Sequence, residues 1–340
     1  LQALSSYRCH EKDRLRVLVV GPVYGGSYPI ACYLKGAFED LGHSVSFVDL
    51  AAFYPGYQEL LAWDTGSDLL RPLEQLLSQL IERRAETFSP DAIVVMAQAP
   101  ICEESLKRIR GDGTPVAYWF VEDHRRMPYW KRLAPSTDAF FVIQREARDA
   151  IHAAGAPFVR YLPLAAQPSI HRPCRLSPEE IERYGSAVSF VGAGYGNRRN
   201  FLARLASPRL KIWGNEWDGS PSVLENLIQE AGRRVDTEET VRIFNASQIN
   251  LNIHSSTYHE EIDPHGDFVN PRAFEIAACG GFQLTDRRSL LPEVFSDQEM
   301  VVFDGLRDAR EKIRHFLDRK EDRRAFAEKG RRRVLREHTY

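Results

Sequence analysis

Residues 15–50 read LRVLVVGPVYGGSYPIACYLKGAFEDLGHSVSFVDL, and this stretch sets the fold class of the first half of the chain. An apolar run at 15–20 leads into a loop that contains glycines. Apolar residues then recur at helical spacing from Ile30 to Leu41, and a second apolar run follows at 45–48. This order predicts a β-α-β unit, whose crossover is right-handed and whose ligands bind at the carboxyl ends of the strands.

The rest of the first half continues the same alternation. Three further apolar runs, with helical stretches between them, are expected to be strands at 92–96, 116–121 and 139–143. Residues 1–162 are therefore predicted to form one doubly wound α/β domain.

A proline-rich passage separates the two halves of the chain. It reads YLPLAAQPSIHRPCRLSP, and because proline disrupts the interior of helices and strands, we interpret residues 163–178 as an interdomain linker. After it the pattern restarts, with strands expected at 187–191, 210–213, 249–253, 282–284 and 300–303, helices from about Asn200 and Pro271, and two terminal helices. Residues 179–340 thus predict a second domain, and the expected fold is two Rossmann-like doubly wound α/β domains facing a cleft.

The composition excludes several classes of protein. The chain has 340 residues, 43% of them hydrophobic and 27% charged, with a formal net charge of −2, as in ordinary globular proteins. No stretch approaches the ~18 uninterrupted apolar residues of a membrane span, and the start has too short an apolar run for a secretory signal. The five cysteines are scattered without a C-x-x-C pair. We expect a cytoplasmic protein with reduced thiols and no nucleic-acid partner.

The block NPRAFEIAACGG, residues 270–281, has the marks of a short helix that begins at a binding site. Asn270 suits the cap that precedes a helix, Pro271 suits its first position, and two glycines suit its end. The positive end of such a helix attracts anions, and Arg272 adds a charged fork in the first turn. We therefore expect a diphosphate to bind there. A surface salt bridge is the alternative for Arg272.

From about Val188 to Tyr340 the sequence resembles the C-terminal domain of group-1 glycosyltransferases, and more closely their CgeB-like, or spore-maturation-like, branch. The resemblance is carried by VSFVGAGYGNRRNFLARL, LKIWGNEW, INLNIHSS, NPRAFEIAACGGFQLTD and the ending EHTY. It implies the two-domain GT-B fold, a nucleotide-sugar donor, and a contact of Glu275 with the donor's ribose hydroxyls. Retaining members carry a second glutamate eight positions earlier, where this chain has the shorter Asp267. A solvent-facing helix residue is the alternative for Glu275.

A glycine loop after the strand at 187–191 is a second candidate part of the donor site. Glycines Gly192 and Gly194 would let a ligand approach the backbone, and Asn197 and Arg198 lie at the start of the following helix. A nicotinamide site is disfavoured, because the third glycine is misplaced and the acid expected about twenty residues later falls at an apolar position.

Two further loops are expected at the donor site. Trp213 and Gly214 end the next strand and are expected to face the nucleobase, with core packing as the alternative for Trp213. His254 follows the strand at 249–253 and is a weaker candidate for phosphate or sugar hydroxyls.

The N-terminal domain is expected to bind the acceptor. The residues expected there, at strand ends, are Tyr24, Gly25, Gly26, Gln98 and Glu122. If the reaction inverts the anomeric carbon, Asp123 or His124 would take the acceptor's proton, and if it retains, they would only orient the acceptor. A plain acidic turn is the alternative for this loop.

The expected chemistry is transfer of a sugar from a nucleoside diphosphate to an acceptor. Helix N-termini with Arg272 or Arg198 would stabilise the departing diphosphate without a metal, and the sequence contains no D-x-D motif. A UDP-sugar is favoured over GDP-, ADP- and dTDP-sugars. Two alternatives remain open, a sugar-nucleotide epimerase and a non-catalytic protein that binds sugar nucleotides. The acceptor stays undefined.

Overall fold

The computed structural model describes residues 14–63 and 69–340, which fall into two compact units with a boundary between Pro163 and Leu164. The proline-rich segment after the boundary belongs to the C-terminal unit. No helix in the described ranges is long and apolar enough to cross a membrane.

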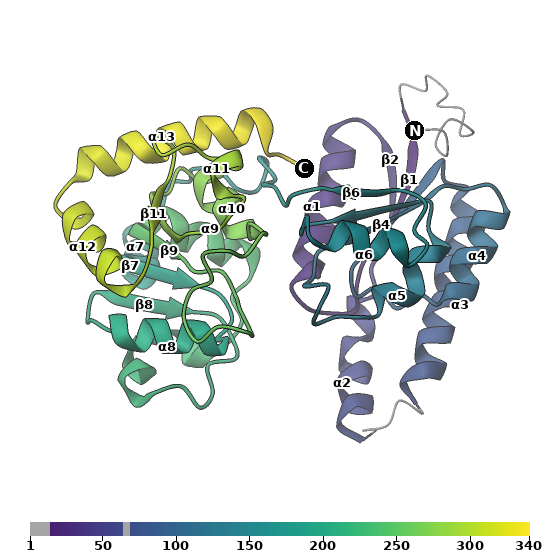
Figure 1. The fold of residues 1–340 in the computed structure, drawn as a ribbon, viewed down its shortest axis with the longest axis horizontal. Helices are drawn as coiled ribbons and strands as arrows, with labels where there is room; N and C mark the ends of the chain where they lie inside the picture. Colours follow the sequence, from purple (N-terminus) through teal and green to yellow (C-terminus); the bar gives the residue numbers. More distant parts are fainter. Residues whose placement is uncertain (1–13, 64–68) are drawn as a thin grey trace. The chain divides into compact units, whose positions relative to one another are not determined.

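The described part of the N-terminal unit contains a parallel sheet of six strands, in the order β2-β1-β3-β4-β5-β6 (Figure 1). The strands are β1 (Arg16–Val20), β2 (Ser44–Val48), β3 (Ala92–Met96), β4 (Val116–Phe120), β5 (Ala139–Val142) and β6 (Val159–Tyr161). The helices are α1 (Ser27–Asp40), η1 (Ala51–Phe53), α2 (Tyr54–Trp63), α3 (Leu70–Phe88), α4 (Glu103–Gly111), α5 (Trp130–Leu133), η2 (Ala134–Ser136) and α6 (Ala147–Ala153).

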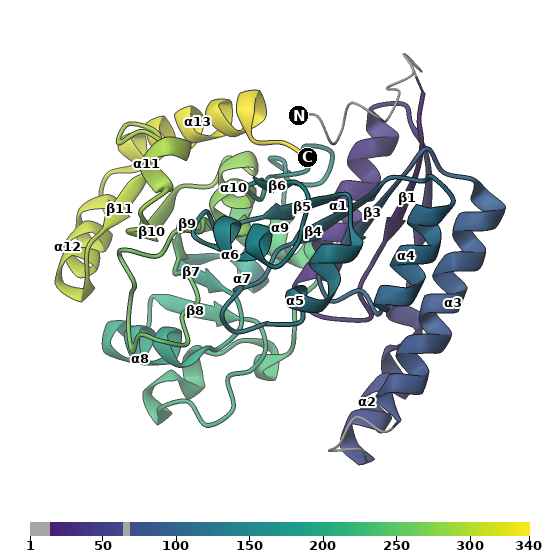
Figure 2. The ribbon, with the colours of Figure 1, turned by 45° about the vertical axis from the view of Figure 1, so that its right-hand side comes forward.

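Helices cover this sheet on both faces, so its inner strands β1, β3, β4 and β5 are almost entirely apolar. Figures 1 and 2 show α1 on one side of the sheet and α3 and α4, packed together, on the other. Leu18, Val20 and Val95 are fully buried in the core, together with the stacked rings of Tyr118 and Phe140. Continuous apolar runs are typical of parallel strands that are buried on both faces.

The C-terminal unit contains a parallel sheet of five strands in the order β11-β10-β9-β7-β8. The strands are β7 (Ser186–Val191), β8 (Leu210–Trp213), β9 (Ser247–Asn252), β10 (Gln283–Asp286) and β11 (Val301–Phe303). The helices are α7 (Pro178–Tyr184), α8 (Gly196–Leu205), η3 (Ser222–Leu227), η4 (Glu230–Gly232), α9 (Thr237–Ala246), α10 (Pro271–Ala278), α11 (Leu291–Val294), α12 (Leu306–Leu317) and α13 (Lys320–Glu337).

The chain ends by pairing with the segment that opens this unit. Ala166 donates its N–H to His338 O at 3.0 Å, and Tyr340 donates to Ala166 O at 3.1 Å. The long helix α13, yellow in Figure 1, packs on α10 and α12 within the same unit.

The predicted fold class is confirmed, since both units are parallel-sheet α/β structures. Helix α10 begins at Pro271 as expected. Helix α8 begins at Gly196, earlier than expected, because the N–H of Arg199 already reaches Tyr195 O at 3.0 Å. In each sheet the order of the strands changes direction between two neighbours. These neighbours are β1 and β3 in the N-terminal unit and β7 and β9 in the C-terminal unit. Ligands of open α/β sheets bind at the carboxyl ends of such pairs.

Candidate functional site

Helix α10 starts at the carboxyl edge of the sheet in the C-terminal unit. The side-chain oxygen of Asn270 accepts the N–H of Ala273 at 3.2 Å, and its amide donates to Asn252 Oδ1, at the end of β9, at 2.7 Å. Pro271 holds the first helical position, where an N–H would lack a partner. The cap expected from the sequence is present, and it places the positive end of α10 where anions can bind.

Glu275 and Arg272 form an ion pair in the first turns of α10. The Glu275 side chain is only 2% exposed, whereas that of Arg272 is 30% exposed. Arg272 also donates from Nε to Val191 O, at the end of β7, at 3.4 Å. The solvent-facing alternative for Glu275 is therefore wrong, and the partner of Arg272 is this buried carboxylate. Arg272 keeps part of its fork accessible to a ligand.

A third residue, His171, joins this pair from the proline-rich segment. Its Nε2 lies 3.9 Å from Glu275 Oε1, and its Nδ1 accepts the N–H of Gln167 at 3.0 Å. Burial lowers the pKa of His171 below its usual value, although Glu275 opposes this shift. The neutral ring therefore carries its proton on Nε2, facing the carboxylate. Sequence reasoning missed His171, and its position in a segment interpreted as a linker explains why.

The glycine loops after β7 and β8 pack against each other. A Cβ atom on Gly194 would lie 2.3 Å from Glu216 O, and one on Gly214, whose φ is +125°, would lie 2.3 Å from Gly192 O. Backbone bonds join the loops as well, from Gly192 N–H to Trp213 O at 2.9 Å. The chain itself fills the space at Gly194, where a ligand was expected to approach, and at Gly214, which was expected to face the nucleobase.

Trp213 does not fit the expectation that it faces a nucleobase. Its side chain is 1% exposed and packs with Val191, Phe244 and Ile276 in a core cluster. Trp213 is therefore a core residue, which was the alternative given for it. A ring with no accessible face cannot stack on a base.

Asn197 and Arg198 fix the loop that follows β9 instead of pointing to solvent. The Asn197 amide donates to His254 O and Glu261 O, both at 2.9 Å. Arg198 donates to Ile253 O at 2.9 Å and to Ala193 O at 3.0 Å. Burial lowers the pKa of Arg198 to about 10. Arg198 was expected to contact phosphate. Instead, its guanidinium binds backbone carbonyls and holds the loops of the site in place.

His254 forms a fully buried pair with Asp286 at the ends of β9 and β10. His254 Nδ1 lies 2.6 Å from Asp286 Oδ1, which also accepts the His254 N–H at 3.0 Å. Burial lowers the pKa of His254, and Asp286 opposes the shift. His254 is therefore held in one orientation beneath the site, and its buried Nε2 has no hydrogen-bond partner in the described structure. Asp286 was missed, although it ends the quoted NPRAFEIAACGGFQLTD block.

The segment that carries Asp267 is held by Arg288, a second residue that the sequence did not suggest. Arg288 is buried and donates to Asp263 O at 2.9 Å and Phe268 O at 3.3 Å, with its guanidinium over the Phe268 ring. Asp267 itself is half-buried, next to Phe268.

In the N-terminal unit, the loops after β1, β3 and β4 meet through one hydroxyl. Ser27 Oγ lies 3.3 Å from Gln98 Oε1 and 3.2 Å from Glu122 Oε1. Gly25, with φ +97°, lies so close to Gln98 that a Cβ atom would be 2.5 Å from its Oε1. Burial raises the pKa of the Glu122 carboxyl. Gly25, Gln98 and Glu122, expected together from the sequence, do lie together, and Ser27 was missed.

Aromatic rings lie beside this cluster. Tyr24 stacks on Tyr54 with ring centres 5.4 Å apart and lies 5.3 Å from the ring of Tyr57, while keeping 38% of its surface exposed. Gly26 precedes α1, and no atom from outside its immediate neighbours lies within 4 Å of the position that a Cβ would take there. An exposed aromatic face beside polar groups is suited to a sugar ring.

Asp123 and His124 belong to a tight turn after β4. Asp123 Oδ1 accepts the N–H groups of Arg125 and Arg126, at 2.8 and 3.3 Å. Gln144 Oε1 accepts the backbone N–H of His124 at 3.0 Å and lies 2.9 Å from its Nδ1. Because that oxygen can only accept, Nδ1 carries the proton and Nε2 is left as the basic nitrogen. Asp123 fits the plain-turn alternative, whereas His124 keeps a nitrogen able to take a proton.

Residues 198–340 match a family described as glycosyl transferase-like. The chain is 26% identical to spore protein CgeB of Bacillus subtilis over 254 residues, which are 72% of this chain and 77% of that protein.

Solved structures with the same fold share little sequence with the chain. Anabaena HepE in complex with UDP and glucose has a TM-score of 0.62 at 12% identity and 96% coverage of each chain. A trehalose-6-phosphate protein from E. coli bound to UDP-2-fluoro glucose has a TM-score of 0.60 at 12% identity and 95% coverage of each chain. Sucrose-phosphate synthase of Thermosynechococcus elongatus has a TM-score of 0.60 at 12% identity, with 96% of this chain and 95% of that chain covered.

Proposed function

We propose that this chain, which is a glycosyltransferase of the GT-B type, transfers a sugar from a nucleoside-diphosphate donor held at α10 to an acceptor held by the N-terminal unit. The observation that carries the proposal is the buried carboxylate of Glu275, paired with Arg272 in the first turns of a capped helix.

The donor's diphosphate would lie at the N-terminus of α10. The positive end of the helix dipole attracts negative charge, and the partly exposed guanidinium of Arg272 adds its own positive charge. Negative charge on the diphosphate grows as the sugar leaves, so these groups stabilise the transition state more than the ground state. We propose that they do so without a metal ion.

The resemblance implies a contact of Glu275 with the donor's ribose, but its side chain is only 2% exposed, with Oε2 facing Arg272 and Oε1 facing His171. Glu275 would therefore act on the donor through Arg272, whose guanidinium it holds in place before any ligand arrives. We favour a UDP-sugar, a choice supported by the UDP and UDP-sugar found with the HepE and E. coli proteins of the same fold.

The acceptor would bind against Tyr24 and the polar cluster of Gln98, Ser27 and Glu122. His124 Nε2 is the group suited to take the acceptor's proton in an inverting reaction. A retaining reaction needs no such base, and in that case His124 would only orient the acceptor. We place the reaction in the cytoplasm, where the free thiols of Cys32, Cys102, Cys174 and Cys279 would stay reduced.

The test is calorimetric titration of the full chain with UDP, GDP, ADP and dTDP, followed by incubation with the matching labelled sugar nucleotide. We expect UDP to bind most tightly, and nucleotide release to require an acceptor from cell extract. Donor conversion without an acceptor would indicate the epimerase, and binding without conversion would indicate the non-catalytic protein. Binding of no nucleotide at all would overturn the proposal.

A further inference from the structure

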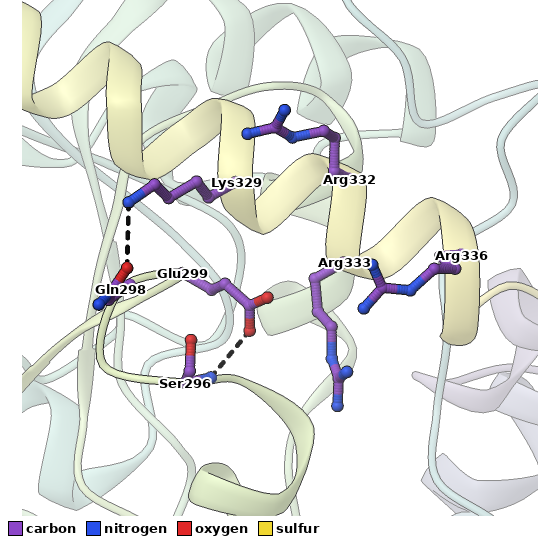
Figure 3. A pocket seen from close by; sticks show the side chains of 7 residues that line it. All are labelled: Ser296, Gln298, Glu299, Lys329, Arg332, Arg333 and Arg336. Carbon is purple, nitrogen blue, oxygen red and sulfur yellow. Dashed lines mark hydrogen bonds between the residues drawn. The ribbon is translucent and has the colours of Figure 1, made fainter.

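A groove beside α13 in the C-terminal unit is lined almost entirely by polar and positively charged side chains (Figure 3). It encloses about 340 Å³. The lining residues are Ser296, Gln298, Glu299, Lys329, Arg332, Arg333 and Arg336. Cavities of several hundred cubic ångströms are the size that binds small molecules.

The cations of this groove come from one face of α13. Lys329, Arg332, Arg333 and Arg336 are spaced three and four residues apart, which places them on the same side of a helix. Figure 3 shows Lys329 and Arg333 reaching from the helix toward the loop that contains residues 296–299. Four positive side chains therefore line the helix side of one concave site, with Lys329 and Arg333 directed at the facing loop.

The carboxylates nearby, Glu299 in the lining and Glu337 beside Arg333 and Arg336, offset only part of this charge. Glu299, which lines the groove, accepts the N–H of Ser296 at 2.9 Å and so closes its own turn. Lys329 donates to the neutral amide oxygen of Gln298 at 3.3 Å. Arg332 pairs with Glu328 only at 3.7 Å, and both side chains are exposed. Such exposed pairs contribute little energy, so an anionic ligand could replace them.

One arginine of the groove is already held in place. Arg333 donates to Val294 O at 2.8 Å and pairs with Glu337 at 2.6 Å. A guanidinium that is ordered before binding loses less entropy when a ligand arrives, and its planar fork matches the oxygens of a phosphate group.

The groove and the donor site are built from different residues. Those that line the groove belong to α13 and to the loop at 296–299, and none of them belongs to α10 or contributes to the donor site at its first turn. A ligand in the groove would therefore not occupy the donor site.

We propose that this groove binds a small phosphorylated molecule that carries two or more adjacent negative charges, at a site separate from the donor site. The concave shape and limited volume favour a compact anion over a flat membrane surface. The proposal does not depend on the glycosyl-transfer reaction, since it rests only on α13 and the facing loop.

Inorganic pyrophosphate is the probe for the test, titrated calorimetrically into the full chain at low salt, with and without saturating UDP. We expect pyrophosphate binding that persists with UDP and in Arg272→Ala. The double variant Lys329→Ala/Arg332→Ala should weaken it by at least roughly tenfold, because two charge-assisted contacts are lost. Both side chains are exposed, so the urea midpoint should stay unchanged.

Arg324→Ala is the matched control, because Arg324 is exposed on the same helix but does not line the groove. Its pyrophosphate affinity should equal that of the wild type. An equal loss in Arg324→Ala would show diffuse attraction to a charged helix and overturn the site. Loss of all pyrophosphate binding in Arg272→Ala, or binding only to vesicles containing phosphatidic acid, would overturn it as well.

Discussion

His171 Nε2 lies 3.9 Å from Glu275 Oε1, and both side chains are almost completely buried. The segment that opens the C-terminal unit thus supplies a side chain to the helix that holds the candidate donor site. Arg272 approaches the other oxygen of the same carboxylate. Glu275 is therefore oriented from two sides, and a change at either partner should alter how it meets a ligand.

Replacing Glu275 with Gln should weaken UDP binding by about 1–3 kcal/mol, because buried partners lose a charged acceptor while the side-chain volume is kept. Isothermal titration measures the change, and urea unfolding of the same variant checks that the fold is intact. A folded Glu275→Gln chain with wild-type affinity would remove this residue from the donor site.

Arg272→Ala should lower turnover by about 10²–10³, while donor affinity falls less, because the positive charge acts mainly on the departing diphosphate. Arg272→Lys should recover only part of the rate, since a point charge cannot form a two-pronged contact with phosphate. The measurement is kcat together with the Kd for UDP. An equal loss in affinity and kcat/KM with kcat intact would show that Arg272 only binds the donor.

Gly214→Ala should destabilise the C-terminal unit by several kcal/mol. The residue has φ +125° and its new Cβ would lie 2.3 Å from Gly192 O, so backbone would have to move. Gly196→Ala is the control, because no atom lies within 4 Å of its added Cβ and it starts a helix. Urea unfolding should show a large loss for the first variant and at most about 1 kcal/mol change for the second. Similar losses of stability in both variants would contradict the conclusion that the loops after β7 and β8 are packed directly against each other.

The free energy of unfolding should fall as pH drops below about 6.5, in part through His171. Burial lowers its folded-state pKa, so just below 6.5 the unfolded chain binds more protons than the folded chain. Neutral His171 contributes its stability to the folded chain above about pH 6.5. This contribution is lost as the pH falls toward the pKa that His171 has in the folded chain.

His171→Gln should therefore reduce the slope of unfolding free energy against pH between about 5 and 7. His315→Gln is the control, because His315 is exposed on α12 and meets water in both states. Urea unfolding at several pH values measures both slopes. A slope unchanged in His171→Gln would mean that burial does not perturb this imidazole.

Most of the fold could be predicted from local patterns. The apolar run at 15–20 and the helical spacing after it correspond to β1 and α1, and Asn270-Pro271 marks the start of α10. These signals are local, because strand burial, helix caps and helix starts depend on neighbouring residues. The meeting of Gly25, Gln98 and Glu122 was also predictable, because all three follow parallel strands whose ends share one edge.

The sequence alone determined the two-unit α/β organisation, the capped helix with Arg272 and Glu275, and the family to which these motifs point. Only the tertiary structure decided which way individual side chains face. It buried Trp213 in the core, turned Arg198 to backbone carbonyls, and brought His171 to Glu275. Periodicity places a residue on an element, but its contacts depend on elements distant in the sequence, packed at a density that leaves one orientation for each buried side chain.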